Sequence, residues 1–343
     1  MKTRNMLSLI LVLAAMVMAG CGGGGDSGSS GPLALTTVAG KADTKGAVDD
    51  IGTAARFNLM AGLVSDGTYL YVADRNNRTI RKVDIASGVV TTLAGTAGEY
   101  GSNDGPGSVA HFGTPEGLAL VGGTLYVTDS GNYTIRKVDI ASGAVSTFAG
   151  TAGVSGTVDG IGTAARFKGP NTITSDGTNL YVTETTIIRK IEIASGNVTT
   201  LAVTDGTGAP VSLYAVLGGA TDGKSFFFQN GVSMISKIDL ATNVITTIAG
   251  TAGVRGIIDG VGSAARLHFM GGFLLDGTTL YFSDDDGDTA PAVLRKLDIV
   301  TGEVTTLAVN GDMGADAALA LTKVGKAVFL AQNNQVITKV ILP

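Results

Sequence analysis

The chain of 343 residues contains no tryptophan, two histidines and a single cysteine. Two histidines are too few for a zinc ion held by three of them. One cysteine excludes an intramolecular disulfide, and no Gly-x-Ser-x-Gly sequence is present, so the chain lacks the nucleophile elbow of α/β-hydrolases. A three-histidine zinc site and a serine nucleophile of the α/β-hydrolase type are therefore excluded.

Positive charge is also scarce. Lysine and arginine number 24 against 29 aspartates and glutamates, the net charge is −5, and charged residues make up only 15% of the chain. Binding to a phosphate backbone needs a basic footprint. We therefore expect no nucleic-acid partner.

Glycine, in contrast, is abundant, at 51 residues, roughly twice its usual share of about 7%. Apolar residues reach 44%, which is too many for a disordered chain, and no Gly-X-Y period indicates collagen. Many short strands joined by tight turns remain as the explanation.

The N-terminus has the pattern of an export signal. Lys2 and Arg4 precede an apolar run over 6–18, which is shorter than the about 20 residues that cross a bilayer and fits a secretory signal. The run ends in Met-Ala-Gly-Cys at 18–21, which resembles the lipobox of bacterial lipoproteins. The resemblance implies a signal peptide over 1–20 and acylation of Cys21.

The residues after Cys21 form a tether. Residues 21–32 are mostly Gly and Ser, and ten such residues span roughly 17 Å. More than one acyl chain makes a membrane anchor stable. We therefore expect a lipid-anchored protein of the cell envelope, periplasmic or surface-exposed, and Gly22 after the cysteine favours the outer membrane.

The remaining sequence repeats six times. One phrase, Ile-Arg-Lys-Val-Asp-Ile with variants, occurs six times and is rich in residues that favour β-strands. A second phrase, Thr-Thr-Val-Ala with variants, also occurs six times. The first phrase lies at 80–85, 135–140, 188–193, 235–240, 294–299 and 337–342. The second lies at 36–39, 91–94, 146–149, 199–202, 246–249 and 305–308.

Each repeat reads as four short strands, which we call a to d. A Ser/Thr-Gly turn joins the two phrases into a hairpin, and two further strand-like runs precede it. Four-stranded units at this spacing indicate propeller blades. The sequence therefore predicts an all-β protein, a six-bladed β-propeller over 33–343.

The two ends of the repeat array predict how the ring closes. The Thr-Thr-Val-Ala strand at 36–39 has no a, b or c strand before it, and the strand at 337–342 has no d strand after it. We expect the N-terminal strand to complete the last blade in a 3+1 arrangement, which leaves no open sheet edge.

The repeats resemble a known family. Leu-Tyr-Val-Ala-Asp at 70–74, an Asn-containing turn and the phrase at 79–84 are similar to the NHL repeat, and Asp-Ser-Gly-Asn at 129–132 is closer still. The copies at 203–250 and 309–342 are eroded. The resemblance implies a propeller of the kind found in secreted bacterial NHL proteins.

The d–a and b–c loops are predicted to share one face, which is where function is expected because a rigid scaffold presents loops there. Four aspartates recur in the long d–a loops, each with a basic residue seven positions later. A ligand-binding ring and a structural Asp–Arg or Asp–backbone clasp both fit this recurrence, and the clasp is favoured because catalytic sites break repeat symmetry. The four pairs are Asp49 with Arg56, Asp104 with His111, Asp159 with Arg166, and Asp259 with Arg266.

A second acidic series, Asp74, Asp129, Glu184 and Asp284, ends the b strands and is expected to cap the following turns. In the fifth repeat this position is extended to Asp284-Asp285-Asp286-Gly287-Asp288. Asp284, Asp286 and Asp288 are weak candidates for Ca²⁺ ligands, but a solvated acidic loop is favoured because the glutamate at the twelfth position of an EF-hand loop is missing.

Two classes of function remain open. The first is a monomeric, non-catalytic binding scaffold, without a cofactor, for a protein, glycan or small molecule. The second is a propeller hydrolase, lactonase or lyase with a carboxylate site, with or without calcium, in the central channel. Convergent carboxylates or amides around the channel would favour the enzyme, and apolar or glycine lining would favour the scaffold. No catalytic residue is assigned.

Overall fold

A computed structural model describes residues 31–287, 292–311, 313 and 318–343. The propeller forms a unit over Pro32–Pro343. The predicted signal peptide, Cys21, nearly all of the tether and Asp288 lie outside the described residues. Within the part of the chain that the structure covers, no helix is long and apolar enough to cross a membrane.

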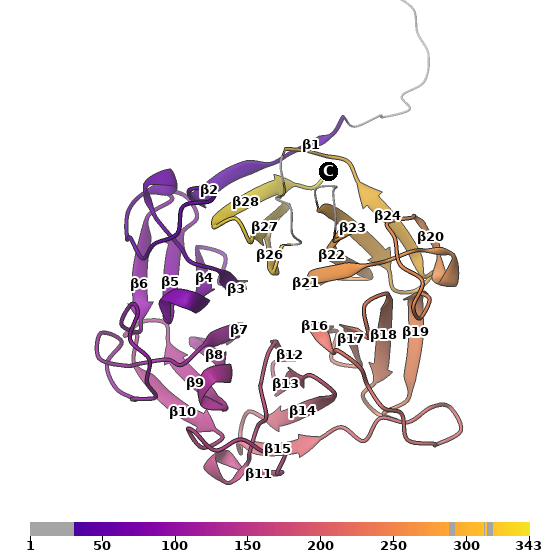
Figure 1. Cartoon of the computed structure of the whole chain (residues 1–343), viewed down its shortest axis with the longest axis horizontal. Coiled ribbons are helices and arrows are strands. Elements are labelled where there is room, and N and C mark those ends of the chain that lie inside the picture. The colour runs from indigo at the N-terminus through magenta and orange to yellow at the C-terminus, as the bar shows by residue number, and fades with distance from the viewer. Residues whose placement is uncertain (1–30, 288–291, 312, 314–317) are drawn as a thin grey trace, which may run out of the picture. The chain divides into compact units, whose positions relative to one another are not determined.

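Six antiparallel sheets surround a central axis and form the predicted six-bladed propeller (Figure 1). In each blade the first strand is innermost and the last is outermost. Blade 1 holds β3 (Met60–Ser65), β4 (Tyr69–Asp74), β5 (Thr79–Asp84) and β6 (Val90–Ala94); blade 2 holds β7 (Pro115–Val121), β8 (Thr124–Asp129), β9 (Thr134–Asp139) and β10 (Val145–Ala149); blade 3 holds β12 (Ile173–Ser175), β13 (Asn179–Glu184), β14 (Ile187–Glu192) and β15 (Asn197–Thr200). Blade 4 holds β16 (Leu217–Thr221), β17 (Ser225–Gln229), β18 (Met234–Asp239) and β19 (Ile245–Gly250); blade 5 holds β21 (Phe269–Asp276), β22 (Thr279–Asp285), β23 (Val293–Asp298) and β24 (Glu303–Leu307); blade 6 holds β26 (Ala320–Val324), β27 (Ala327–Ala331), β28 (Val336–Ile341) and β2 (Thr36–Gly40).

The N-terminal strand closes the ring as predicted. β2 is the outermost strand of blade 6 and pairs antiparallel with β28, with Thr37 opposite Thr338. A second contact adds to this closure, because β1 (Leu33–Ala34) pairs in parallel with β25 (Val309–Asn310), which follows blade 5. Backbone hydrogen bonds therefore join the two ends of the array, and the outer edge of β28 is covered.

The hydrophobic core lies between neighbouring blades. In β4, Leu70 packs in a cluster with Phe329 of blade 6, whereas Tyr71 packs in a cluster with Leu125 of blade 2. Successive residues of a strand point to opposite faces of its sheet. Both faces of each blade are therefore buried, which explains why the strands lack a clean alternation of polar and apolar residues.

The long d–a loops cover the outside of the next blade before they enter it. β11 (Gly160–Ile161) adds to the outer edge of β15, and β20 (Gly260–Val261) adds to the outer edge of β24. A short 3₁₀ helix then turns the chain inward: η1 (Gly52–Ala54), η4 (Gly162–Ala164) and η5 (Gly262–Ala264). The b–c turns of blades 1 and 2 are also 3₁₀ helices, η2 (Arg75–Asn77) and η3 (Ser130–Asn132). The loops thus fasten blades together.

Candidate functional site

The recurring acids are held by buried arginines. In blade 2 the Arg136 side chain is fully buried. Its Nη2 donates to Asp104 Oδ1 at 2.6 Å, its Nη1 donates to Asp129 Oδ2 at 3.2 Å, and its guanidinium lies 5.2 Å from the Phe112 ring centre. Equivalent pairs join Arg81 to Asp49 and Asp74, Arg189 to Asp159 and Glu184, and Arg295 to Asp259 and Asp284.

This geometry supports the predicted clasp but changes its partners. The loop aspartates bond the strand arginines and a threonine of the outermost strand, as Asp104 does with Thr147, and not the basic residue seven positions later. That residue bonds locally instead. Arg56, Arg166 and Arg266 donate to carbonyls of the adjacent 3₁₀ helices, and His111 pairs with Glu99.

The acids at the ends of the b strands were expected to cap the following turns, but they mainly bond the loop that enters the blade. Asp129 Oδ1 accepts from the amides of Gly113 and Thr114 at 2.9 and 2.8 Å, and these amides precede the inner strand. The following turn contributes the Asn132 side chain, at 2.6 Å, and not its backbone amides. Each of these acids therefore ties the entering loop to its own blade.

Within these clasps the two carboxylates titrate differently. Burial raises the pKa of Asp284 to about 6, although the hydrogen bond and charge of Arg295 oppose the shift. For Asp259 partial burial also acts to raise the pKa, but hydrogen bonds from Thr306 and the nearby Arg295 outweigh it, so its pKa is lowered. The difference follows from exposure, since the Asp284 side chain is fully buried and the Asp259 side chain is about half exposed.

The calcium candidates are placed only in part. Asp284 Oδ2 accepts from Arg295 at 2.7 Å and Oδ1 accepts from the His268 amide at 3.0 Å. Its carboxylate is thus engaged in the fold. Asp286 lies in the loop that follows β22, and Asp288 lies outside the described residues. Among the residues that are described, no group of three or more His, Cys, Asp or Glu is placed to hold a metal ion.

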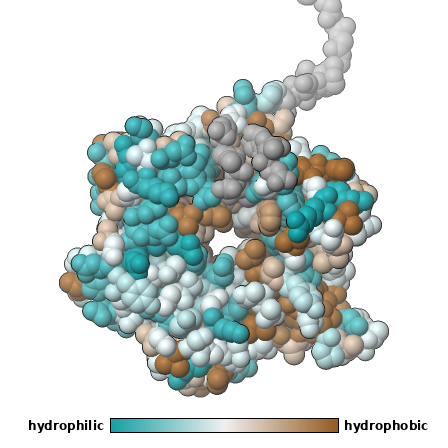
Figure 2. Space-filling model, viewed as in Figure 1, coloured by the Kyte–Doolittle hydropathy of each residue, from teal (hydrophilic) through white to brown (hydrophobic). Residues whose placement is uncertain are grey.

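The central channel contains a cavity with a volume of about 380 Å³. All six innermost strands or the residues just before them line it, and so do Arg75 and Asn333 from two b–c turns. The cavity therefore opens beside the b–c turns, at the end of the channel where the inner strands begin. Figure 2 shows this opening, with apolar surface on the side of β16 and β21 and more polar surface on the side of β7.

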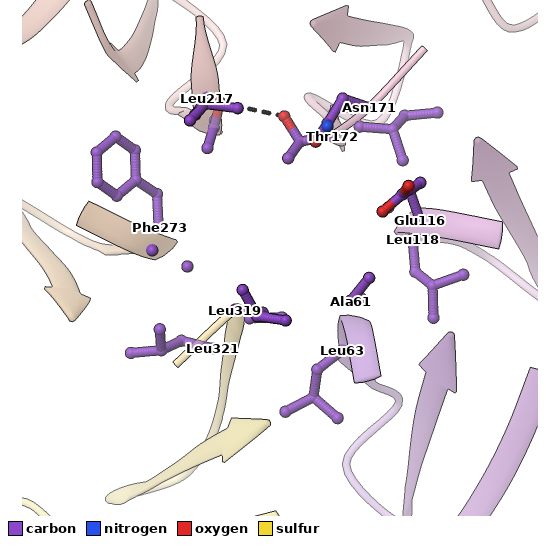
Figure 3. A pocket seen from close by; sticks show the side chains of 18 of the residues that line it. Ala61, Leu63, Glu116, Leu118, Asn171, Thr172, Leu217, Phe273, Leu319 and Leu321 are labelled. Atoms are coloured by element: carbon purple, nitrogen blue, oxygen red, sulfur yellow. Dashed lines mark hydrogen bonds between the residues drawn. The ribbon is translucent and has the colours of Figure 1, made fainter. Parts of the chain in front are cut away.

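Equivalent positions of the six blades form two rings around the cavity (Figure 3). The first ring is mixed: Ala61, Glu116, Asn171, Leu217, Gly271 and Leu319. The second ring, two residues further along five of the strands, is apolar: Leu63, Leu118, Ile173, Phe273 and Leu321. The polar residues of the first ring are neighbours on blades 2 and 3. Leu319 of blade 6 lies across the channel from Asn171, and Leu217 of blade 4 lies beside it (Figure 3).

The two charged residues that line the cavity neutralise each other. Arg75 Nε donates to Glu116 Oε1 at 2.7 Å, and Ser130 Oγ donates to the same oxygen at 3.3 Å. Beside them Thr172 Oγ1 hydrogen-bonds Thr183 Oγ1 at 2.7 Å and the Gly218 carbonyl at 3.1 Å. The described lining thus contains one carboxylate, and that carboxylate is already paired with an arginine.

Sequence reasoning did not identify these channel residues. The first-ring side chains differ in every blade, so no repeated motif marks them. The buried arginines, by contrast, belong to the repeated phrase, and blades 4 and 6 carry Ser236 and Thr338 in their place. In the loop before blade 4, Asp205 accepts from the amides of Thr207 and Ala209 in its own turn.

Comparisons with known proteins agree with the repeat type and the fold. No family model matches the chain. The chain is similar to the protein SUPPRESSOR OF QUENCHING 1, chloroplastic, of Arabidopsis thaliana, with 27% identity over 75% of this chain and 27% of that protein. It is also similar to NHL repeat-containing protein 2 of Bos taurus, with 34% identity over 34% of this chain and 16% of that protein. The chain thus spans about a quarter or less of these relatives.

Among solved structures, the chain is similar to one described as an auxiliary nutrient binding protein from Bacteroides ovatus. The TM-score is 0.65, the identity is 17%, and the match covers 90% of this chain and 76% of the other. At this identity the likeness concerns the fold.

Proposed function

We propose that this chain, an NHL-repeat β-propeller, is a monomeric binding scaffold that takes a ligand in its central channel without transforming it. The observation that carries the proposal is the lining of the 380 Å³ cavity, which is mostly leucine, glycine and other apolar residues. Ligand sites are typically concave and apolar with a few placed polar groups. A carboxylate-based hydrolase or lyase needs several free acids, and Glu116 is held by Arg75.

The ligand enters from the face formed by the b–c and d–a loops. Arg75 and Asn333 lie in b–c turns and line the cavity, and the leucines that precede or begin the inner strands of blades 4 and 6 are part-exposed there. The similarity to an auxiliary nutrient binding protein supports a binding role in coarse terms.

The scaffold works at the cell envelope. The lipobox-like sequence at 18–21 and the Gly/Ser stretch that follows support acylation of Cys21 and a tether to the outer membrane. Mass spectrometry of the N-terminal peptide tests this: we expect a mature chain that begins at a triacylated Cys21, and a Cys21→Ser variant that stays unlipidated. A mature chain cleaved elsewhere, without lipid, would refute the anchor.

Binding and catalysis are separated by one set of measurements on the mature chain. A glycan array and a metabolite library are screened in parallel with metal analysis and with ester and lactone substrates. We expect a bound ligand that is recovered unchanged and no turnover. Stoichiometric calcium together with lactonase or esterase turnover would replace the scaffold with an enzyme.

A further inference from the structure

We infer that the channel selects a small, uncharged, amphipathic molecule, whose polar end lies at blades 2 and 3 and whose apolar body lies across blades 4 to 6. This inference rests on the proposed function, because it assumes that the channel is the binding site. The asymmetry of the two rings carries it.

The apolar side of the cavity has large side chains that the described residues leave partly exposed. Leu217 and Leu319, in the first ring, are 39% and 36% exposed. Phe273 and Leu321 of the second ring add to this wall (Figure 3). Gly271, the first-ring residue of blade 5, has no side chain. Covering such a surface is favourable in proportion to its apolar area. An apolar ligand body supplies that cover.

The polar side offers hydrogen bonds but no net charge. The Asn171 side chain makes no hydrogen bond with the described residues, so its amide is available to accept from or donate to a ligand. Glu116 already accepts from Arg75 and Ser130 through Oε1. A charged ligand would have to break this ion pair or remain uncompensated in an apolar cavity, and both are costly. A hydroxyl or amide head group incurs neither cost.

The size of the cavity limits the molecule. Its 380 Å³ lies near the lower end of the range of small-molecule pockets, and it corresponds to roughly a dozen water molecules at about 30 Å³ each. The second ring is apolar in all five of its residues. The volume of the site therefore suits a compact molecule.

A series of straight-chain alcohols tests the inference on the full mature chain carrying Cys21→Ser, which needs no detergent. Isothermal titration from butanol to octanol is expected to show an affinity gain of about fourfold per methylene until the apolar wall is covered. Hexanoate and hexylammonium are expected to bind at least about tenfold more weakly than hexanol. Asn171→Ala is expected to weaken hexanol binding several-fold.

Leu217→Asn and Leu319→Asn locate the binding, and both are expected to weaken hexanol binding about tenfold. The matched control is Ile161→Asn, because Ile161 is 65% exposed but lies in β11 at the outer edge of blade 3; it should leave the affinity unchanged. If hexanoate or hexylammonium binds as tightly as hexanol and the leucine variants weaken it, the ligand class is wrong and the channel site stands. If neither leucine variant changes binding of any alcohol, both proposals fail.

Discussion

Replacing Arg136 with serine, the residue that blade 4 carries at the equivalent position, is expected to destabilise the propeller by about 3–5 kcal/mol. The magnitude follows from the buried groups that lose their hydrogen-bond and charge partner when the guanidinium is removed. Asp129 is fully buried and would lose its positive partner, and the carbonyls of His111 and Asn103, which accept from Arg136 at 2.9 and 3.0 Å, would lose their donors. An unpaired buried carboxylate is the dominant cost.

The double variant Asp129→Asn with Arg136→Ser is expected to recover about half of that loss. Blade 4 shows that the neutral combination is compatible with the fold, because Asn230 and Ser236 occupy these positions and Asn230 Nδ2 donates to Ser236 Oγ at 3.4 Å. Removing both charges removes the uncompensated carboxylate. The two substitutions should therefore couple by at least about 1 kcal/mol in a double-mutant cycle.

Urea unfolding, followed by far-ultraviolet circular dichroism because the chain has no tryptophan, measures the four stabilities. The matched control is Arg166→Ser, since Arg166 bonds only local carbonyls near the surface, and it should cost no more than about 1 kcal/mol. A double variant as unstable as the sum of its two single variants would refute the reasoning.

Three further outcomes are expected. Burial raises the folded-state pKa of Asp284 to about 6, above an unfolded value of about 3.9, so the folded state binds the extra proton between these values. The stability that this proton contributes is complete below about pH 4 and is lost as the pH rises through about 6. The free energy of urea unfolding should therefore fall over that window by up to about 3 kcal/mol relative to an Asp284→Asn variant, and parallel profiles would contradict this. Gly150→Ala should destabilise the fold by about 2 kcal/mol more than Gly153→Ala. Both glycines have positive φ, 87° and 75°, but a Cβ at Gly150 meets the Tyr133 carbonyl at 2.5 Å and one at Gly153 meets open space; equal unfolding midpoints would contradict it. Deleting residues 33–40 should uncover the edge of β28 and cause concentration-dependent association in light scattering, whereas deletion of residues 21–32 should leave the propeller monomeric.

The parts of the fold that could be predicted from the sequence are the strands that correspond to the two repeated phrases. The strand at 36–39 has no a, b or c strand before it, the strand at 337–342 has no d strand after it, and the structure pairs the two as β2 and β28. The clasp was predictable only in kind. Asp104 and Arg136 lie 32 residues apart, and the nearer basic residue looked like the natural partner because local pairs are easier to see in a sequence.

The channel was beyond the reach of sequence reasoning for a physical reason. Its chemistry lies in single residues such as Glu116 and Leu217, one from each blade, which become neighbours only when the ring closes. A bulge also shifts the register of β7 between Pro115 and Leu118 and that of β16 between Leu217 and Ala220. Periodicity along one strand therefore does not say which residue faces the axis.

The pairing of β2 with β28 also sets an order of events. Thr36 Oγ1 donates to the carbonyl of Lys339, 303 residues away, so β2 is synthesised long before the strand with which it pairs. Until the two pair, blade 6 has only three strands and β28 has a bare edge. Any chain that ends before residue 336 lacks β28 altogether, and with it the strand on which β2 docks. Closure of the ring through β2 therefore requires that synthesis has passed β28.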